Sequence, residues 1–526
     1  MNTAVIHRQI PCCVAYVFMV ALLMTSLAAD DKVDSSLFPD AYGILGTEKY
    51  LFPVALGDWP VRVDGSRQLF VDDYLIKSID GVTREFHKLK RHPSNPLWTP
   101  PRRIGLLYSV LRTESGRFQL WYMQRIQAVN EDGKKRRYPT GYLESDDGVH
   151  WRAPSLGVVS ADGSKDNNYV FEKSLDGVVY TPWEEDASKR YKGLVHFEPS
   201  NDKTDEPLEG YWLYVSPDGI RWRRERGDPV AVSLIDYKIP QSGIGDTSSF
   251  RWDRKLKRFI CNTKFVLPGK YRAYGISESD DLIHWSPPRM MFYRDAFDPE
   301  GMEFYAHTTF DYESMWFGLV KTMEISQPER AGGKWKHCEL QLSLSRDGRH
   351  FTRCADRSPF LPVPESLDAF DMDYPCVPSG VPIRMGDELW FYYADRRHQN
   401  RPGAERDTVD MRLFLATLRV DGFASLNAGE RPGVVVTRPL TYAGKTLYVN
   451  ADVAPGGSIR CELRRFDGQV VESHSFGKSQ PVRGDTFRGK LTWVTSETLP
   501  PTRQTGYRLA LELTKAKLYS FWIAEN

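Results

Sequence analysis

Short runs of apolar residues recur along the chain, rich in β-branched and aromatic side chains and bounded by Gly, Asp, Asn or Pro. The clearest runs are residues 118–125, 191–197, 258–266, 315–323 and 388–395. Their composition and length are typical of β-strands. No amphipathic segment with helical period reaches a comparable length. The hydrophobic pattern therefore predicts an all-β protein.

A seven-residue motif, Ser-x-Asp-Gly-x-x-aromatic, recurs between these runs. Its copies are SDDGVHW (145–151), SPDGIRW (216–222), SDDLIHW (279–285), SRDGRHF (345–351) and a degenerate fifth copy at 419–423. The motif aspartates are 71, 63, 66 and 74 residues apart, which indicates an array of supersecondary units. Each unit is predicted to hold four strands, with the motif at the turn between the third and the fourth. There Asp binds turn backbone and Gly supplies a positive φ, so the motif is interpreted as structural.

Five four-stranded units predict a five-bladed β-propeller, which avoids exposed sheet edges by closing on itself. A solenoid is the alternative, although it would show tighter periodicity and capping units. The stretch RQLFVDDYLI (67–76) is expected to supply a closing strand to the last blade. Alternating apolar and polar residues after the fifth motif copy predict a separate C-terminal β-sandwich. The expected organisation is a signal peptide (1–29), an N-terminal extension (30–66), the propeller (67–429) and the sandwich (430–526).

The first residues have the order of a secretory signal peptide. His7 and Arg8 precede an apolar run at 12–24, and small residues up to Ala29 fit a cleavage site before Asp30. A membrane anchor is the alternative, but the run is shorter than the ~20 residues that a spanning helix needs. We therefore expect a secreted or periplasmic protein without a membrane span.

Charge and cysteine content exclude several classes of protein. The 70 Lys and Arg against 69 Asp and Glu leave a net charge of +1, which argues against a nucleic-acid or anionic-membrane partner. Five cysteines remain after the predicted signal, an odd number in a large chain, so a disulfide scaffold is not expected. Buried thiols are the expectation, with a Cys338–Cys354 pair across neighbouring strands as the alternative.

The repeated motif, its five-blade spacing, the segment RVDGFASLNAGE (419–430) and the terminal LYSFWI together carry a family resemblance. They resemble the arabinanase, levansucrase and invertase superfamily, and within it the secreted glycosidase-like proteins of families 32 and 43. The resemblance covers roughly residues 67–526 and implies a five-bladed propeller with glycosidase activity. The motif is also similar to the sialidase Asp-box, which implies a six-bladed enzyme as a weaker alternative.

The sequence departs from the invertase pattern at its catalytic signatures. The Trp-x-Asn-Asp-Pro, Arg-Asp-Pro and Glu-Cys signatures are absent, and the Asp72-Asp73 pair lacks the Pro-Asn-Gly that would follow it. Catalytic residues must therefore be sought by their position in each blade.

Carboxylates stand at or near the start of the predicted innermost strand of blades two to five, and therefore at one mouth of the channel. They are Asp176, Asp246, Glu303, Asp371 and Asp373. Glycoside hydrolysis needs one protonated and one ionised carboxyl group, and close carboxylates have divergent pKa values. Glu303, the one Glu of the set, is the predicted acid, Asp246 the base or nucleophile, and Asp371 the partner that tunes or orients them.

Further polar residues at the strand ends are predicted to bind substrate hydroxyls, or a carboxylate or sulfate on a sugar. With Asp176 and Asp373 this set comprises Tyr108, Arg125, His196, Lys264, His307, Lys321, Arg396 and His398. No cofactor is expected, because metal-binding HxH and HExxH, hydrolase GxSxG and nucleotide-binding glycine loops are absent. A structural Ca²⁺ in the channel stays open.

The sequence thus predicts a secreted glycoside hydrolase acting on plant or algal polysaccharide or oligosaccharide, with a sandwich that braces the propeller or binds glycan. A propeller that binds carbohydrate or protein without catalysis is the main alternative.

Overall fold

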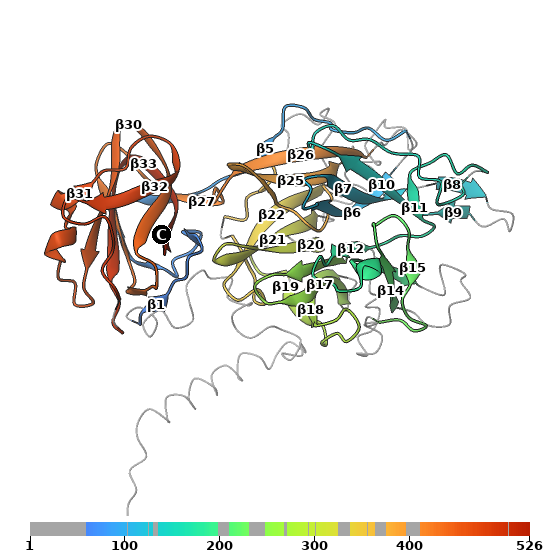
Figure 1. The fold of residues 1–526 in the computed structure, drawn as a ribbon, viewed down its shortest axis with the longest axis horizontal. Helices are drawn as coiled ribbons and strands as arrows, with labels where there is room; N and C mark the ends of the chain where they lie inside the picture. Colours follow the sequence, from blue (N-terminus) through green and yellow to red (C-terminus); the bar gives the residue numbers. More distant parts are fainter. Residues whose placement is uncertain are drawn as a thin grey trace, which may run out of the picture.

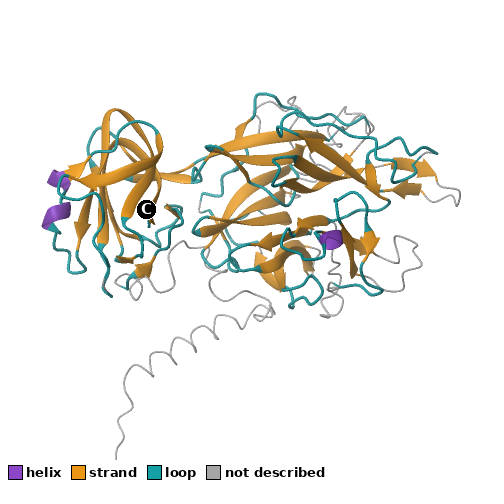
Figure 2. Cartoon of the chain, in the orientation of Figure 1, coloured by secondary structure: helices purple, strands orange, loops and turns teal. Residues whose placement is uncertain are grey.

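The fold is given by a computed structural model. It describes residues 59–101, 104–124, 126–129, 135–161, 163–197, 210–230, 248–267, 271–292, 294–299, 301–324, 337–354, 356–362, 375–395, 411–502 and 504–525. The predicted signal peptide lies outside them. Two β-rich bodies lie side by side, the larger at right and the C-terminal one at left (Figure 1). Within the described ranges strands predominate, and the helices are single 3₁₀ turns (Figure 2).

Five four-stranded antiparallel sheets form the larger body, which confirms the predicted five-bladed propeller. Blade 1 contains β6 (Ile104–Arg112), β7 (Phe118–Gln124), β10 (Thr140–Ser145) and β11 (Tyr169–Phe171). Blade 2 contains β12 (Gly177–Tyr180), β13 (Tyr191–Phe197), β14 (Gly210–Ser216) and β15 (Arg223–Arg224). Blade 3 contains β16 (Ser249–Asp253), β17 (Arg258–Leu267), β18 (Tyr271–Ser279) and β19 (Arg289–Phe292). The six-bladed alternative is therefore wrong.

Blade 4 contains β20 (Met302–Tyr312), β21 (Met315–Glu324), β22 (His337–Ser345) and β23 (Thr352–Arg353). Blade 5 contains β24 (Ile383–Met385), β25 (Glu388–Asp395), β26 (Arg412–Arg419) and, from the N-terminal side of the chain, β5 (Lys90–Arg91). A hairpin of β8 (Ile126–Val129) and β9 (Lys135–Arg137) extends from blade 1, and the 3₁₀ turn η2 (Ala187–Lys189) lies in blade 2. Among the described residues, no helix is long and apolar enough to cross a membrane.

The strand that closes the last blade is not the predicted one. β5 pairs with β26, whereas β2 (Gln68–Leu69) and β3 (Ile76–Asp80) pair with strands of the C-terminal body. The apolar residues of the stretch 67–76 serve another purpose. Leu69 and Val71 pack in the propeller core, and Phe70 packs in the core of the other body. This stretch is the layer between the two bodies.

The motif occupies the turn after the third strand of blades 1 to 4, and its contacts confirm the structural interpretation. In the first copy the Ser145 hydroxyl accepts a hydrogen bond from the Gly148 N–H at 2.8 Å. The Asp147 carboxylate accepts two more from the next turn residues, and the Trp151 indole donates to the Gly148 carbonyl at 3.0 Å. Burial acts to raise the pKa of Asp281 in the third copy, but hydrogen bonds from His284 and Ile283 outweigh it and lower that pKa to about 2.

The C-terminal body has one nine-stranded sheet built on two long strands, β30 (Thr446–Arg464) and β33 (Arg508–Ala524). The other members are β2, β3, β4 (Thr83–Phe86), β27 (Ala424–Ala428), β28 (Gly433–Thr437), β31 (Ser479–Gln480) and β32 (Thr486–Trp493). Outside this sheet, β1 (Val61–Arg62) pairs in parallel with β29 (Leu440–Thr441), and the 3₁₀ turns η4 (Glu472–His474) and η5 (Phe476–Lys478) precede β31. The body has a hydrophobic core of its own, as a separate unit requires.

The five cysteines of the described chain are buried thiols, as expected, and Cys338 and Cys354 do not form a disulfide.

Candidate functional site

A pocket lies where the innermost strands of the five blades converge. Its lining comes from every blade: Leu106, Leu107 and Tyr108 of blade 1, Asp176 at the start of blade 2, Ser248 and Ser249 of blade 3, Ala306, Thr308 and Lys321 of blade 4, and Cys376, Val377 and Ser379 before blade 5. Its empty volume is about 480 Å³ with the mouth included. That figure includes open solvent, and the cavity proper measures about 40 Å³, which is room for a water-sized group rather than for a whole ligand.

Hydrogen bonds between blades fix the pocket wall. The Ser379 N–H donates to the Tyr108 carbonyl at 2.9 Å, which places the segment before blade 5 alongside β6. The Ser109 hydroxyl accepts from the Val178 N–H at 2.8 Å, which joins blade 1 to blade 2. Since these contacts join the first blade to the second and the last, the pocket depends on closure of the ring.

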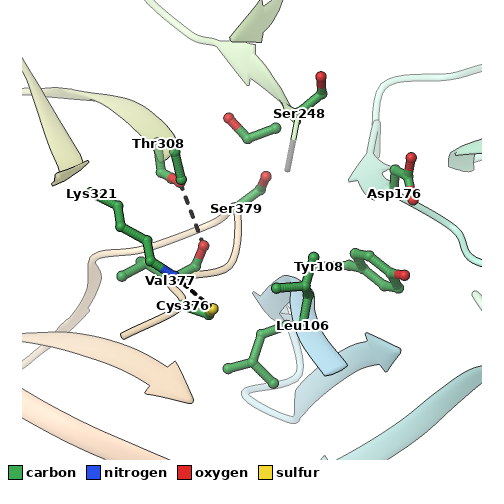
Figure 3. Close-up of a pocket in the computed structure, with 12 residues that line it drawn as sticks. Leu106, Tyr108, Asp176, Ser248, Thr308, Lys321, Cys376, Val377 and Ser379 are labelled. Atoms are coloured by element: carbon green, nitrogen blue, oxygen red, sulfur yellow. Dashed lines mark hydrogen bonds between the residues drawn. The ribbon is translucent and has the colours of Figure 1, made fainter. Parts of the chain in front are cut away.

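A lysine and an aspartate line opposite sides of the pocket (Figure 3). Lys321 and Asp176 lie on opposite sides of it, with Tyr108 between blades 1 and 2 (Figure 3). The Lys321 ammonium is 3.4 Å from the Cys376 sulfur, and the Thr308 hydroxyl is 3.5 Å from the Val377 carbonyl. Burial raises the pKa of Tyr211 well above its usual value, and the negative charge of Asp176 adds to that rise. The structure therefore brings together three predicted residues, Tyr108, Asp176 and Lys321.

A cationic corner adjoins the pocket at the boundary of blades 3 and 4. The Lys264 and Lys321 ammonium nitrogens lie 5.9 and 5.2 Å from the centroid of the Tyr305 ring. The Arg272 guanidinium lies 5.4 Å from the same centroid, so three cations lie around one aromatic ring. The predicted ligand residue Lys264 thus lies beside the pocket but does not line it.

Glu303, the predicted acid, lies in the same corner and outside the pocket lining. It is buried, and its carboxylate forms a short ion pair with Arg272 from the neighbouring blade. A charge-assisted hydrogen bond to arginine stabilises an anion, whereas a general acid must carry a proton. The contact suits a positioning residue better than a proton donor.

The two described histidines of the prediction are not in the pocket. His307 is 0 % exposed, and its Nε2 lies 3.0 Å from the Ser343 hydroxyl inside blade 4. Burial and the nearby charge of Arg251 lower the pKa of His307 to about 3, so the imidazole is neutral. His196 packs beside Tyr211 with ring centroids 5.0 Å apart. Strand alternation turns His307 away from the axis while its neighbours Ala306 and Thr308 line it.

The remaining predicted residues lie outside the described residues. They are Asp246, Asp371, Asp373, Arg125, Arg396 and His398. Their roles stay predictions.

Several pocket residues were missed by the sequence reasoning. They are small and polar or apolar: Ser248, Ser249, Thr308, Cys376, Val377 and Ser379. Residue type does not mark them as pocket residues, because Ser and Thr are common and a lone cysteine is usually a buried core thiol. Their position at or just before the innermost strands was the usable signal. Among the described residues, no group of three or more His, Cys, Asp and Glu has the arrangement of a metal site.

Neither a protein-family model nor a curated protein matches the sequence. Similar solved structures include a thermostable family-43 glycoside hydrolase, at 14 % identity over 63 % of this chain and 96 % of that one, with a TM-score of 0.40. A β-1,2-mannobiose phosphorylase from Listeria innocua matches at 13 % identity, 64 % and 98 % coverage, and a TM-score of 0.42. A GH32 β-fructofuranosidase from Bombyx mori matches at 11 %, 84 % and 94 %, with a TM-score of 0.40. Likeness of this degree decides nothing about activity.

Proposed function

We propose that the protein is a secreted glycoside hydrolase acting on plant or algal polysaccharide or oligosaccharide in the pocket at the propeller axis. The observation that carries the proposal is the pocket itself, to which all five blades contribute and which Asp176 and Lys321 line from opposite sides (Figure 3). The polar residues Ser248, Ser249, Thr308 and Ser379 also line the pocket. Such a lining offers donors and acceptors for the hydroxyl groups of a sugar.

Hydrolysis of a glycosidic bond at this site requires a proton donor and a second carboxylate. The donor protonates the glycosidic oxygen as its bond to the anomeric carbon breaks. In one case the second carboxylate deprotonates the water that attacks that carbon, which completes the addition of water across the bond. In the other it attacks the carbon itself, and water then hydrolyses the glycosyl-enzyme ester while the first residue, now a base, takes the proton of that water. Asp176 is the described carboxylate that lines the pocket, and we propose it as one of the pair.

The second carboxylate is proposed among the predicted acids next to pocket residues in the chain. Asp246 precedes Ser248 by two positions, and Asp371 precedes Cys376 by five. Asp246 remains our proposal for base or nucleophile and Asp371 for its tuning partner. We propose that Glu303, through its contact with Arg272, positions the cationic corner and is not the proton donor that the sequence predicted.

The test is release of reducing sugar by the mature chain, residues 30–526, on a panel of plant and algal glycans and aryl glycosides. Asp176→Asn and Asp246→Asn are each expected to lower kcat at least 10³-fold with folding intact. Glu172→Gln is the matched control, since Glu172 is an exposed acid on the segment that leads to Asp176. Activity that survives both Asp changes would refute the site assignment.

A propeller that binds carbohydrate without cleaving it is the second candidate. The observation in its favour is that Asp176 is the one carboxylate lining the pocket among the described residues, whereas hydrolysis needs two. Binding of an oligosaccharide by calorimetry, lost in Lys321→Met, with no product release from any glycan would establish this candidate and overturn the hydrolase.

Secretion is proposed from the residues before Asp30. Expression of the full chain in a bacterial host is expected to yield an exported protein whose first residue is Asp30, as read by N-terminal sequencing. A chain that keeps residues 1–29 and stays in the cell would contradict it.

A further inference from the structure

The C-terminal body has a hollow in its surface, far along the chain from the propeller pocket. It is lined by Trp59, Pro60, Phe466, Gln504 and Thr505 and has an empty volume of about 590 Å³ with its open mouth included. The Trp59 side chain is 72 % exposed and that of Phe466 41 % exposed. Large apolar groups that gather in the open around one hollow mark a binding surface.

Three distant segments meet at the hollow because β29 joins two of them. The carbonyl of Trp59 accepts a hydrogen bond from Arg438 at 3.0 Å, and β1, just after it, runs parallel to β29. On the other edge of β29, Leu440 and Tyr507 exchange backbone hydrogen bonds of 2.7 and 3.0 Å. The Trp59 segment and the turn that carries Gln504 and Thr505 are therefore held on either side of one short strand.

The third segment is the hairpin that follows β30. Arg464, the last residue of β30, pairs in register with Arg508, the first of β33, so the hairpin and the 504–507 turn lie at one end of the ladder. The Arg508 guanidinium lies 5.7 Å from the centroid of the Phe466 ring. Gly506 has φ +65° and its Cβ position would lie 2.5 Å from the Leu440 carbonyl, so glycine is required there. The hollow is thus formed before any ligand arrives, which lowers the entropic cost of binding.

The lining matches the chemistry of an uncharged sugar ring. Faces of Trp59 and Phe466 can pack on the C–H face of a pyranose, while the Gln504 carboxamide and the Thr505 hydroxyl can bind its hydroxyl groups. The described lining residues carry no charge, so an anionic ligand finds no counter-ion among them. A stable protein partner needs about 20–30 residues on each side, and five residues are too few.

We propose that this hollow is a second glycan-binding site, which holds one sugar ring of a neutral polysaccharide chain. It is separate from the propeller pocket and does not require that the pocket be catalytic. A protein with both sites would be retained on a polymer while the propeller pocket meets chain segments nearby, a gain in effective concentration.

The test is affinity electrophoresis of the mature chain, residues 30–526, in gels that contain mixed-linkage glucan, galactomannan or arabinoxylan. We expect at least one polymer to retard the protein. Trp59→Ala should weaken that binding at least about tenfold, because it removes the largest stacking surface, and Phe466→Ala should weaken it too. The matched control is Val494→Ala, since Val494 is 72 % exposed on the same body but does not line the hollow.

Propeller binding is separated from this site by Lys321→Met, which removes a residue of the propeller pocket and should still leave the protein retarded by the polymer. Retardation that disappears in Lys321→Met, or that persists in Trp59→Ala and Phe466→Ala, would overturn the proposal. So would the absence of retardation with every polymer. In gel filtration, a larger elution volume for Trp59→Ala than for the wild type would identify the hollow as a contact between two copies of the chain. That result would also refute the proposal.

Discussion

Asp421, the aspartate of the fifth motif copy, binds side chains outside its own turn and joins the two bodies. The Asp421 side chain is 0 % exposed and accepts hydrogen bonds from Arg67 at 2.6 Å, Tyr312 at 2.8 Å, Asn450 at 2.8 Å and Ser520 at 2.6 Å. Removing one partner of a buried ion pair costs about 3–5 kcal/mol, and each buried donor left without an acceptor about 1–3 kcal/mol more. Because Arg67 also lies over the Trp522 ring at 4.2 Å, we place the ion-pair loss at the lower end. Asp421→Ala should therefore lower the free energy of unfolding by at least about 4 kcal/mol.

The assay is urea unfolding followed by tryptophan fluorescence and far-ultraviolet circular dichroism. Because the Asp421 contacts join propeller residues to C-terminal strands, their loss should separate unfolding into two transitions, one for each body. The matched control is Asp347→Ala, the same motif position in blade 4, where the half-exposed carboxylate serves only its own turn and a loss of about 1–2 kcal/mol is expected. Equal effects of the two substitutions, with one transition in each, would refute this account of the junction.

Three further results follow from named contacts. Since the pKa of buried His307 is lowered to about 3, the unfolded chain binds a proton that the folded one does not, and stability is lost as pH falls below about 6.5. Its contribution to the free energy of unfolding should fall by about 2 kcal/mol between pH 7 and 5, and His307→Gln should remove that part of the pH dependence in urea titrations. Gly148→Ala should lower the free energy of unfolding by about 2–4 kcal/mol, because φ is +80° and the Cβ position lies 2.5 Å from a neighbouring side-chain oxygen. The control Gly163→Ala, at φ +77° in open space, should lower it by about 1 kcal/mol, as measured by thermal unfolding. Glu303→Gln, which weakens the ion pair with Arg272, should raise KM more than it lowers kcat if Glu303 positions the cationic corner, and a kcat loss as large as that of Asp176→Asn would show instead that it is the acid.

Local pattern was enough to predict the blades. The motif residues act within seven positions of one another, as the Ser145, Asp147 and Trp151 contacts show, so their spacing carries the architecture directly. The closing strand could not be predicted in this way. Length does not distinguish the short strand β2 inside the stretch 67–76 from the equally short β5, and only packing against two cores selects one for the junction and the other for blade 5.

The candidate site was predictable in part for a related reason. The start of an inner strand indicates which mouth a residue approaches, and Tyr108, Asp176 and Lys321 do reach one pocket. The sequence does not show which way a side chain of blade 4 faces or what it contacts. The prediction therefore missed that His307 is a core residue and that Glu303 is ion-paired.

The sequence by itself determined the all-β class, the number of blades and the position of every motif turn, because these depend on side chains that are near one another in the chain. Only the tertiary structure decided how the ring closes, which polar residues share the axial pocket, and that Asp421 joins the two bodies. These depend on contacts between residues tens to hundreds of positions apart, such as Asp421 with Arg67, and burial by a distant partner leaves no mark on local composition.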